Sequence, residues 1–161
     1  ALGEYSKAIE IDSTKEKAYY EMGKLYMKSN RKTEAFESYT KAIAADPAAI
    51  DPLMQRAAIY YANKEYKNAI ADYDSVISIS KVYYLAYRER GMAKLMLYYY
   101  NDAADDFTRF LIFKPEDAMA YYYRGLSRIG NRENEDGCLD FNTALKLGYT
   151  NAQSAIDKSC K

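Results

Sequence analysis

A regular set of arginine and aspartate residues carries the most distinctive chemistry in this 161-residue sequence. The arginines recur at a constant period, and each is followed by an aspartate at the same interval; the pairs are Arg56 and Asp72, Arg90 and Asp106, and Arg124 and Asp140. A guanidinium and a carboxylate can form two parallel charge-assisted hydrogen bonds. We therefore expect a structural ion pair inside each of these three repeats. The alternative interpretation is a row of arginines that binds an acidic ligand.

The first copy of the pattern supports the structural interpretation. There Met22 takes the place of the arginine and Ser38 takes the place of the aspartate, so the two positions change together within one chain. A row of arginines that bound a ligand would not require this matched change. The paired charges are therefore expected to join two helices of the same repeat.

The residue types argue against catalysis. The chain has no histidine, which removes the commonest general base and a common metal ligand. Two cysteines alone cannot complete a structural zinc site. No glycine-rich phosphate loop is present, and carboxylates such as Asp105 and Glu133 are typical of solvated helix faces or turns. We expect no enzyme activity, no catalytic residue, no metal and no cofactor.

The two cysteines leave two interpretations open. Cys138 and Cys160 lie at equal intervals before and after Tyr149, which we place near the turn between two antiparallel helices. A disulfide between them would stabilise the C-terminal end by about 3 kcal/mol in the chain-entropy model, and would require an oxidising compartment. The alternative is a pair of small buried apolar residues in a reducing cytosol.

One fixed period organises the whole chain. Small residues hold one position of every copy, and these are Gly23, Ala57, Gly91 and Gly125. Each copy has a second small position, such as Ala35, and an aromatic position about one helical turn later, such as Tyr39. Within each copy the apolar residues recur at intervals of three and four, which predicts helices with one buried face. The period is about 34 residues, a length that indicates stacked copies of one helical hairpin.

These positions closely resemble the signature of the tetratricopeptide repeat family, except that Tyr or Leu replaces the usual early Trp. The resemblance implies an all-α, right-handed superhelical solenoid of stacked antiparallel helix pairs with a C-terminal capping helix. We expect one continuous solenoid domain. Its parts are the second helix of a truncated repeat at 1–15, four repeats at 16–49, 50–83, 84–117 and 118–149, and the capping helix at 150–161. Thr150 and Gln153 are expected to form a capping box at that last helix.

The resemblance also implies where a partner binds. In this family the first helix of each repeat lines a concave groove, with its second, fifth, ninth and twelfth residues facing the partner. The resulting candidate binding residues are Tyr20, Lys24, Met27, Met54, Tyr61, Leu85, Arg88, Met92, Leu95, Met119 and Tyr122. A surface rich in Met and Tyr is typical of an adaptable site for a peptide or helix with apolar anchors. Leu126 and Ile129 occupy the same positions but could be covered by the C-terminal helix.

A different ligand, the acidic C-terminal tail of chaperones, is gripped in some family members by a clamp of Lys, Asn, Asn, Lys and Arg. The matching positions here are Tyr20, Lys24, Gln55, Leu85 and Glu89, of which only Lys24 is cationic. We therefore expect a partner other than such a tail.

The expected function is a non-catalytic scaffold for protein–protein interaction. Two alternatives are a structural or oligomerisation module of a bacterial envelope or secretion assembly, and a regulatory domain of a larger protein. Equal numbers of basic and acidic residues argue against nucleic acid, and no apolar run predicts membrane insertion. An uncapped N-terminal end would permit self-association. The C-terminal region resembles Bacteroidetes-type repeat proteins, which favours a periplasmic or envelope location, with the cytoplasm as the alternative.

Overall fold

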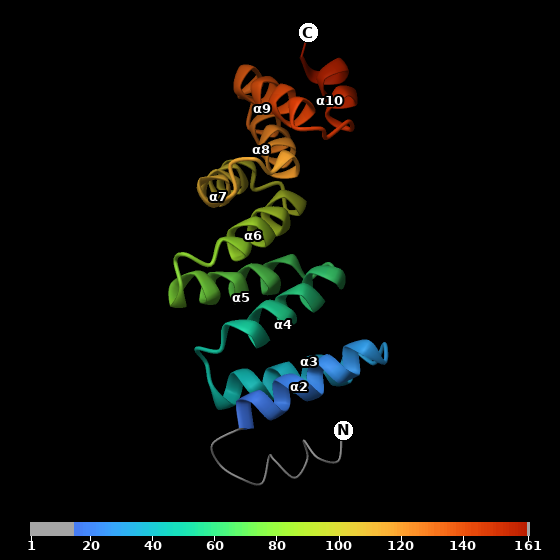
Figure 1. The fold of residues 1–161 in the computed structure, drawn as a ribbon, viewed down its shortest axis with the longest axis vertical. Coiled ribbons are helices and arrows are strands. Elements are labelled where there is room, and N and C mark those ends of the chain that lie inside the picture. Colours follow the sequence, from blue (N-terminus) through green and yellow to red (C-terminus); the bar gives the residue numbers. More distant parts are fainter. Residues whose placement is uncertain (1–14, 161) are drawn as a thin grey trace. The chain divides into compact units, whose positions relative to one another are not determined.

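The computed structural model describes residues 15–160, which form helices and no strand (Figure 1). The helices are α2 (Lys15–Lys28), α3 (Lys32–Ala45), α4 (Ile50–Ala62), α5 (Tyr66–Ile79), α6 (Tyr84–Met96), α7 (Tyr100–Phe113), α8 (Ala118–Gly130), α9 (Asn134–Lys146) and α10 (Ala152–Ser159). The prediction of an all-α repeat fold is confirmed for this part of the chain. The truncated repeat at 1–15 and the uncapped N-terminal end lie almost wholly outside the described residues.

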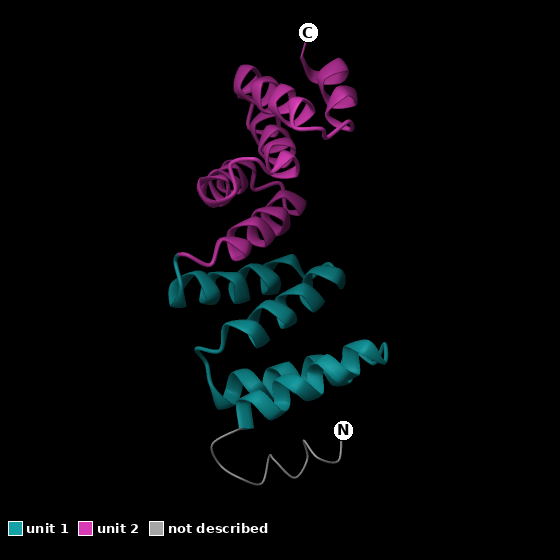
Figure 2. Ribbon diagram, viewed as in Figure 1, with its two compact units in different colours: residues 1–81 teal, residues 82–161 magenta. Residues whose placement is uncertain are grey.

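The chain divides into two compact units, one up to Lys81 and the other from Val82 (Figure 2). In unit 1, α2 packs against α3, α3 against α4, and α4 against α5. In unit 2, α6 packs against α7, α7 against α8, α8 against α9, and α9 against α10. Each unit therefore stacks two helical hairpins, and α10 adds a further helix to unit 2.

Every hairpin turns through one residue with left-handed backbone. These residues are Asn30, Lys64, Tyr98 and Arg132, with φ between 57° and 69°. Two backbone bonds close the turn after α4: Lys64 N–H donates to Tyr61 O at 2.9 Å, and Glu65 N–H donates to Tyr60 O at 2.8 Å. This is the Schellman arrangement that satisfies the free carbonyls at a helix end. The repeated turn is therefore set by backbone hydrogen bonds, because four different side chains occupy its centre.

The helix pairs meet closely because small residues face large aromatic rings. Gly23 lies under Tyr39, Gly91 against Phe107, and Gly125 under Phe141. The three rings are at most 1% exposed. A Cβ atom on Gly125 would lie 2.7 Å from the Phe141 ring and 3.0 Å from the Gly137 carbonyl oxygen. A larger residue at this position would push the two helices apart.

Alanine substitution should destabilise the chain at Gly125 but have little effect at Gly91. We expect Gly125→Ala to lower the free energy of unfolding by about 1–3 kcal/mol, because both the ring and the backbone of α9 must move. Gly91→Ala should change it little. Its Cβ would meet neighbours at 3.2 Å, and alanine gains about 1 kcal/mol of helix propensity over glycine. Urea unfolding of both variants checks this, and equal losses would contradict it.

The helix ends include one error of prediction. Thr150 and Gln153 do not form a capping box, since α10 begins after Asn151, whose side chain makes no capping bond. The Gln153 side chain instead donates to Asp157 Oδ1 at 2.8 Å. A capping side chain is found at α8, where Asp117 Oδ1 accepts the Ala120 N–H at 2.8 Å. The sequence motif alone does not show which residue ends the preceding turn.

Candidate partner-binding surfaces

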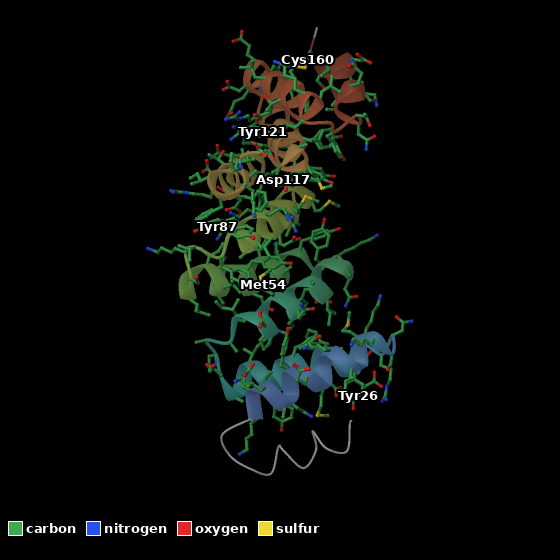
Figure 3. All side chains as sticks on the ribbon, in the orientation of Figure 1. Tyr26, Met54, Tyr87, Asp117, Tyr121 and Cys160 are labelled. Atoms are coloured by element: carbon green, nitrogen blue, oxygen red, sulfur yellow. A yellow bond between two sulfur atoms is a disulfide. The ribbon has the colours of Figure 1, made fainter. Side chains whose placement is uncertain are left out.

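The predicted binding residues of unit 1 lie on α2 and α4, where Figure 3 labels Met54. They are half-buried or exposed, and Met27 is 37% exposed. Lys24 donates to Glu21 Oε1 at 2.7 Å and lies 5.0 Å from the centre of the Tyr20 ring. The cation on this face is therefore already paired with a carboxylate, while Met27 and Met54 leave apolar surface accessible.

The predicted residues of unit 2 lie on α6 and α8, which contact each other. Leu85, Met92 and Leu95 are half-buried and pack on a core that includes Phe107 and Phe110. Met119 is 49% exposed. The unit 2 face, defined by Leu85, Met92, Leu95 and Met119, is thus a partly exposed apolar surface supported by a rigid core.

Arg88, on α6, is the one cation among the predicted binding residues of unit 2. Its Nε and Nη2 both donate to Glu89 Oε1, at 3.0 and 2.7 Å, and its guanidinium lies 5.5 Å from the centre of the Phe110 ring. Glu89 is also one of the positions where the chaperone-tail clamp has a cation. The ion pair between Arg88 and Glu89 therefore reduces the positive charge to which an acidic peptide could bind.

The end of α8 is covered by the C-terminal segment. Tyr122 lies 4.9 Å from Tyr149 between ring centres. Leu126 and Ile129 pack in the same cluster as Ile156 of α10. Burial also raises the pKa of the Tyr122 hydroxyl above its ordinary value. Tyr122 thus contributes to the packing around α10 as well as lying at a predicted binding position.

Each arginine of the repeated pattern contacts its aspartate. Arg56 donates from Nε and Nη2 to Asp72 at 2.8 and 2.7 Å, and Arg124 does so to Asp140 at 2.9 and 2.7 Å. Arg90 binds Asp106 in the same two-bond geometry. The three carboxylate side chains are between 3% and 8% exposed. The hydrogen bonds that Arg56 donates to the Asp72 carboxylate raise the pKa of Arg56. These ion pairs join α4 to α5, α6 to α7, and α8 to α9.

Two further cations, which sequence reasoning missed, reach the carboxylates of unit 2. Lys94 Nζ lies 2.9 Å from Asp106 Oδ2, and Arg128 Nη1 lies 2.7 Å from Asp140 Oδ2. At the same position the earlier repeats have Tyr26 and Tyr60. The exchange of Tyr for a cation, in two neighbouring copies that both have an aspartate, is the signal that could have found them.

The two cysteines are joined in the structure. Cys138 on α9 and Cys160 after α10 form a disulfide, with Cα atoms 5.7 Å apart, and Cys160 is labelled in Figure 3. The bond closes a sequence separation of 22 residues and holds the end of α10 beside α9.

Tyr39 brings an unusual polar group into the core of unit 1. Its side chain is 1% exposed, and its hydroxyl has no hydrogen-bond partner among the described residues. Burial raises its pKa to about 12. Phe107 and Phe141 occupy the corresponding position in unit 2, so the repeat itself does not require the hydroxyl.

We expect Tyr39→Phe to stabilise the chain by about 1 kcal/mol, because it removes a buried unsatisfied hydroxyl. It should also reduce alkaline unfolding. The folded-state pKa lies above the ordinary value of 10.0, so the unfolded chain loses its proton first, and stability falls as the pH rises from about 10 to about 12. Chemical unfolding at pH 8 and pH 11 measures both effects. A destabilised variant would show that the hydroxyl has a partner in solution.

The remaining chemistry of the described residues is limited. Across residues 15–160, His, Cys, Asp and Glu side chains do not form a group of three or more that could hold a metal ion. None of the described helices combines the length and apolar character that a membrane crossing requires. What the side chains do provide is two partly apolar surfaces on packed helices, and such surfaces suit protein recognition.

Comparison with known proteins identifies this class of helical repeat. The family model of the tetratricopeptide repeat matches residues 16–48 and 50–83. The chain belongs to the tetratricopeptide repeat family, as its repeated residues predicted. It is 34% identical over 114 residues to the mouse RNA polymerase II-associated protein 3, a match that covers 70% of this chain and 17% of that protein. It is 29% identical over 125 residues to the yeast small glutamine-rich tetratricopeptide repeat-containing protein 2, covering 78% of this chain and 30% of the relative. The chain thus spans less than a third of either relative.

Two solved structures show the same fold. MamA from Desulfovibrio magneticus superposes with a TM-score of 0.80 at 22% identity, over 85% of this chain and 77% of that one. The first repeat domain of Spaghetti (RPAP3), bound to the HSP90 peptide SRMEEVD, gives a TM-score of 0.70 at 28% identity, over 77% of this chain and 98% of that one. Both curated relatives are eukaryotic, so they do not support the bacterial origin suggested by the C-terminal region.

Proposed function

We propose that this chain is a non-catalytic scaffold that binds a peptide or short helix of a partner protein through apolar anchors. The unit 2 face carries the proposal. Leu85, Met92 and Leu95 stay partly exposed although they rest on a fully buried core, and Met119 lies on the neighbouring helix. Tetratricopeptide repeats can bind peptides, since the similar Spaghetti domain is bound to one. The Tyr20, Met27, Met54 and Tyr61 side chains give unit 1 a second surface of the same kind.

The residues favour an apolar peptide over an acidic tail of the SRMEEVD type. A terminal carboxylate needs unpaired cations, but Lys24 is bound to Glu21 and Arg88 is bound to Glu89. Tyr20, Leu85 and Glu89 stand where the chaperone-tail clamp has its three cations. Met and Leu side chains adapt to many apolar partners because they are flexible and polarisable. The acidic peptide is therefore the second candidate, supported by the resemblance to the Spaghetti domain.

A peptide selection would test this function. Random heptapeptides are selected on the purified chain, and the tightest peptide is compared with SRMEEVD. We expect Met92→Glu to weaken the selected peptide at least tenfold, and Met54→Glu to do so if unit 1 takes part. Ile112→Glu is the matched control, because Ile112 is 65% exposed on α7, outside the predicted surface. Equal binding by wild type and Met92→Glu would reject the unit 2 face, and tighter binding of SRMEEVD would reject the apolar preference.

The alternatives remain distinguishable from this proposal. A structural or oligomerisation module would associate with itself as its concentration rises, independently of Met92. A regulatory domain would change the activity of a linked enzyme. The disulfide favours an oxidising compartment. Balanced charge argues against nucleic acid as the partner.

A further inference from the structure

Unit 1 contains a cavity of about 440 Å³ that is separate from the predicted binding residues. It lies among the start of α3, the end of α4 and the start of α5. Its lining includes Lys32, Phe36, Tyr60, Asn63, Glu65 and Asn68. The volume falls in the range of natural ligand sites.

The cavity has aromatic walls and a polar rim. Phe36 and Tyr60 meet edge to face with ring centres 5.1 Å apart, and Ile59 beside them is 6% exposed. At the rim, Asn68 Nδ2 donates to Glu65 Oε2 at 2.9 Å. Lys32, at the start of α3, is exposed. An aromatic ring with one hydroxyl matches this combination, because its face or edge packs on the walls while the hydroxyl reaches the rim.

The corresponding helix junction in unit 2 holds a tyrosine of the chain itself. Moving two repeat periods along the sequence replaces Lys32 by Tyr100 and Ala62 by Gly130. The Tyr100 ring lies against Gly130, so close that a Cβ atom there would be 2.5 Å from the ring. The rim is retained, with Asn131 bonded to Glu133 as Asn63 is to Glu65. Unit 2 therefore places its own tyrosine ring at this helix junction, where unit 1 has Lys32. The cavity walls are particular to unit 1, because Ala104, Ser127 and Arg128 of unit 2 take the places of Phe36, Ile59 and Tyr60.

We propose that the unit 1 cavity binds a tyrosine side chain presented by a partner protein. The phenol ring packs against Phe36, Tyr60 and Ile59. Its hydroxyl donates to the Glu65 carboxylate, which also accepts from Asn68. The chain therefore recognises its partner at a second surface, which uses none of the residues of the unit 2 face. A variant that disrupts binding at one surface therefore allows binding at the other surface to be measured alone.

The test uses p-cresol, the side-chain analogue of tyrosine, titrated into the 161-residue chain and followed by NMR. We expect saturable shifts of the Asn63 and Asn68 side-chain amides. The double variant Lys32→Tyr/Ala62→Gly brings the Tyr–Gly contact of unit 2 to the edge of the cavity and should abolish these shifts. Lys67→Tyr, an exposed position on α5 outside the lining, is the control and should retain them.

A second comparison keeps the test valid if the double variant does not fold. The single variant Lys32→Tyr should also weaken the binding of p-cresol, and 4-methylcyclohexanol, which lacks the aromatic ring, should bind wild type less tightly than p-cresol. Wild type that shows no shift at Asn63 and Asn68 before the chain begins to unfold would overturn the proposal. So would a folded Lys32→Tyr/Ala62→Gly variant that binds as wild type does, or equal binding of the two probes.

Discussion

Replacing Asp106 with alanine should lower the free energy of unfolding by about 3–5 kcal/mol, the usual cost of removing one partner from a buried ion pair. The carboxylate is 3% exposed and binds both Arg90 and Lys94, whose side chains are 16% and 15% exposed. Asp106→Ala would leave these two cations near one another with little access to water. Urea unfolding followed by circular dichroism measures the loss.

The first repeat supplies a matched rescue for this variant. It holds Met22, Tyr26 and Ser38 at the three corresponding positions. We therefore expect Arg90→Met/Lys94→Tyr/Asp106→Ser to recover most of the stability, because no buried charge is left unpaired. Glu21→Ala is the control for an exposed pair, since the Lys24 and Glu21 side chains are 42% and 37% exposed, and it should cost less than about 1 kcal/mol. A loss for Asp106→Ala as small as that of the control would show that the cluster contributes little.

Removing the disulfide should have the second large effect. We expect Cys138→Ala/Cys160→Ala to destabilise the chain by about 3 kcal/mol, since the bond closes a sequence separation of 22 residues. The loss should concentrate in α10, whose Ile156 packs in one cluster with Leu126 and Ile129. Hydrogen exchange of the α10 amides, together with thermal unfolding, measures both consequences.

Reduction of the wild-type chain provides the matched condition. A thiol reductant should lower the Tm of wild type and leave that of the double variant unchanged. Hydrogen exchange of the α2 and α3 amides in unit 1 should not change when the disulfide is reduced. Equal Tm values for oxidised and reduced wild type would mean that α10 is held by its packing alone.

Much of the fold followed from the repeat period. Spacing of small and aromatic residues predicted the hairpins, because Gly23 and Tyr39 can face each other only if two helices run antiparallel at close distance. The constant interval between arginine and aspartate, as in Arg56 and Asp72, likewise placed both groups at one level of a hairpin. These relations depend on backbone position, which the period determines directly. The connection between α9 and α10 was harder to predict, because its residues lie outside the repeat period.

The finer features depend on side-chain conformation. Lys94 reaches Asp106 through a long flexible stem, and the sequence does not show which way such a stem turns. The cavity beside Lys32 depends on how the Phe36 and Tyr60 side chains are arranged around an open space, and an open space leaves no direct pattern in the sequence. The unpaired hydroxyl of Tyr39 was equally hidden, since Tyr and Phe both satisfy the aromatic position of the repeat.

The paired charges also bear on how a chain of this kind can change its length. Arg56 and Asp72 lie in one hairpin, as do Arg124 and Asp140, while the side-chain bond from Arg124 to the preceding hairpin goes to the neutral hydroxyl of Thr108. Each of these hairpins therefore contains both partners of its repeated ion pair. A gene duplication or deletion of one whole hairpin would leave no buried arginine or aspartate without its partner. Because both partners of each buried ion pair lie in the same hairpin, the hairpin can serve as a unit of inheritance as well as a unit of packing.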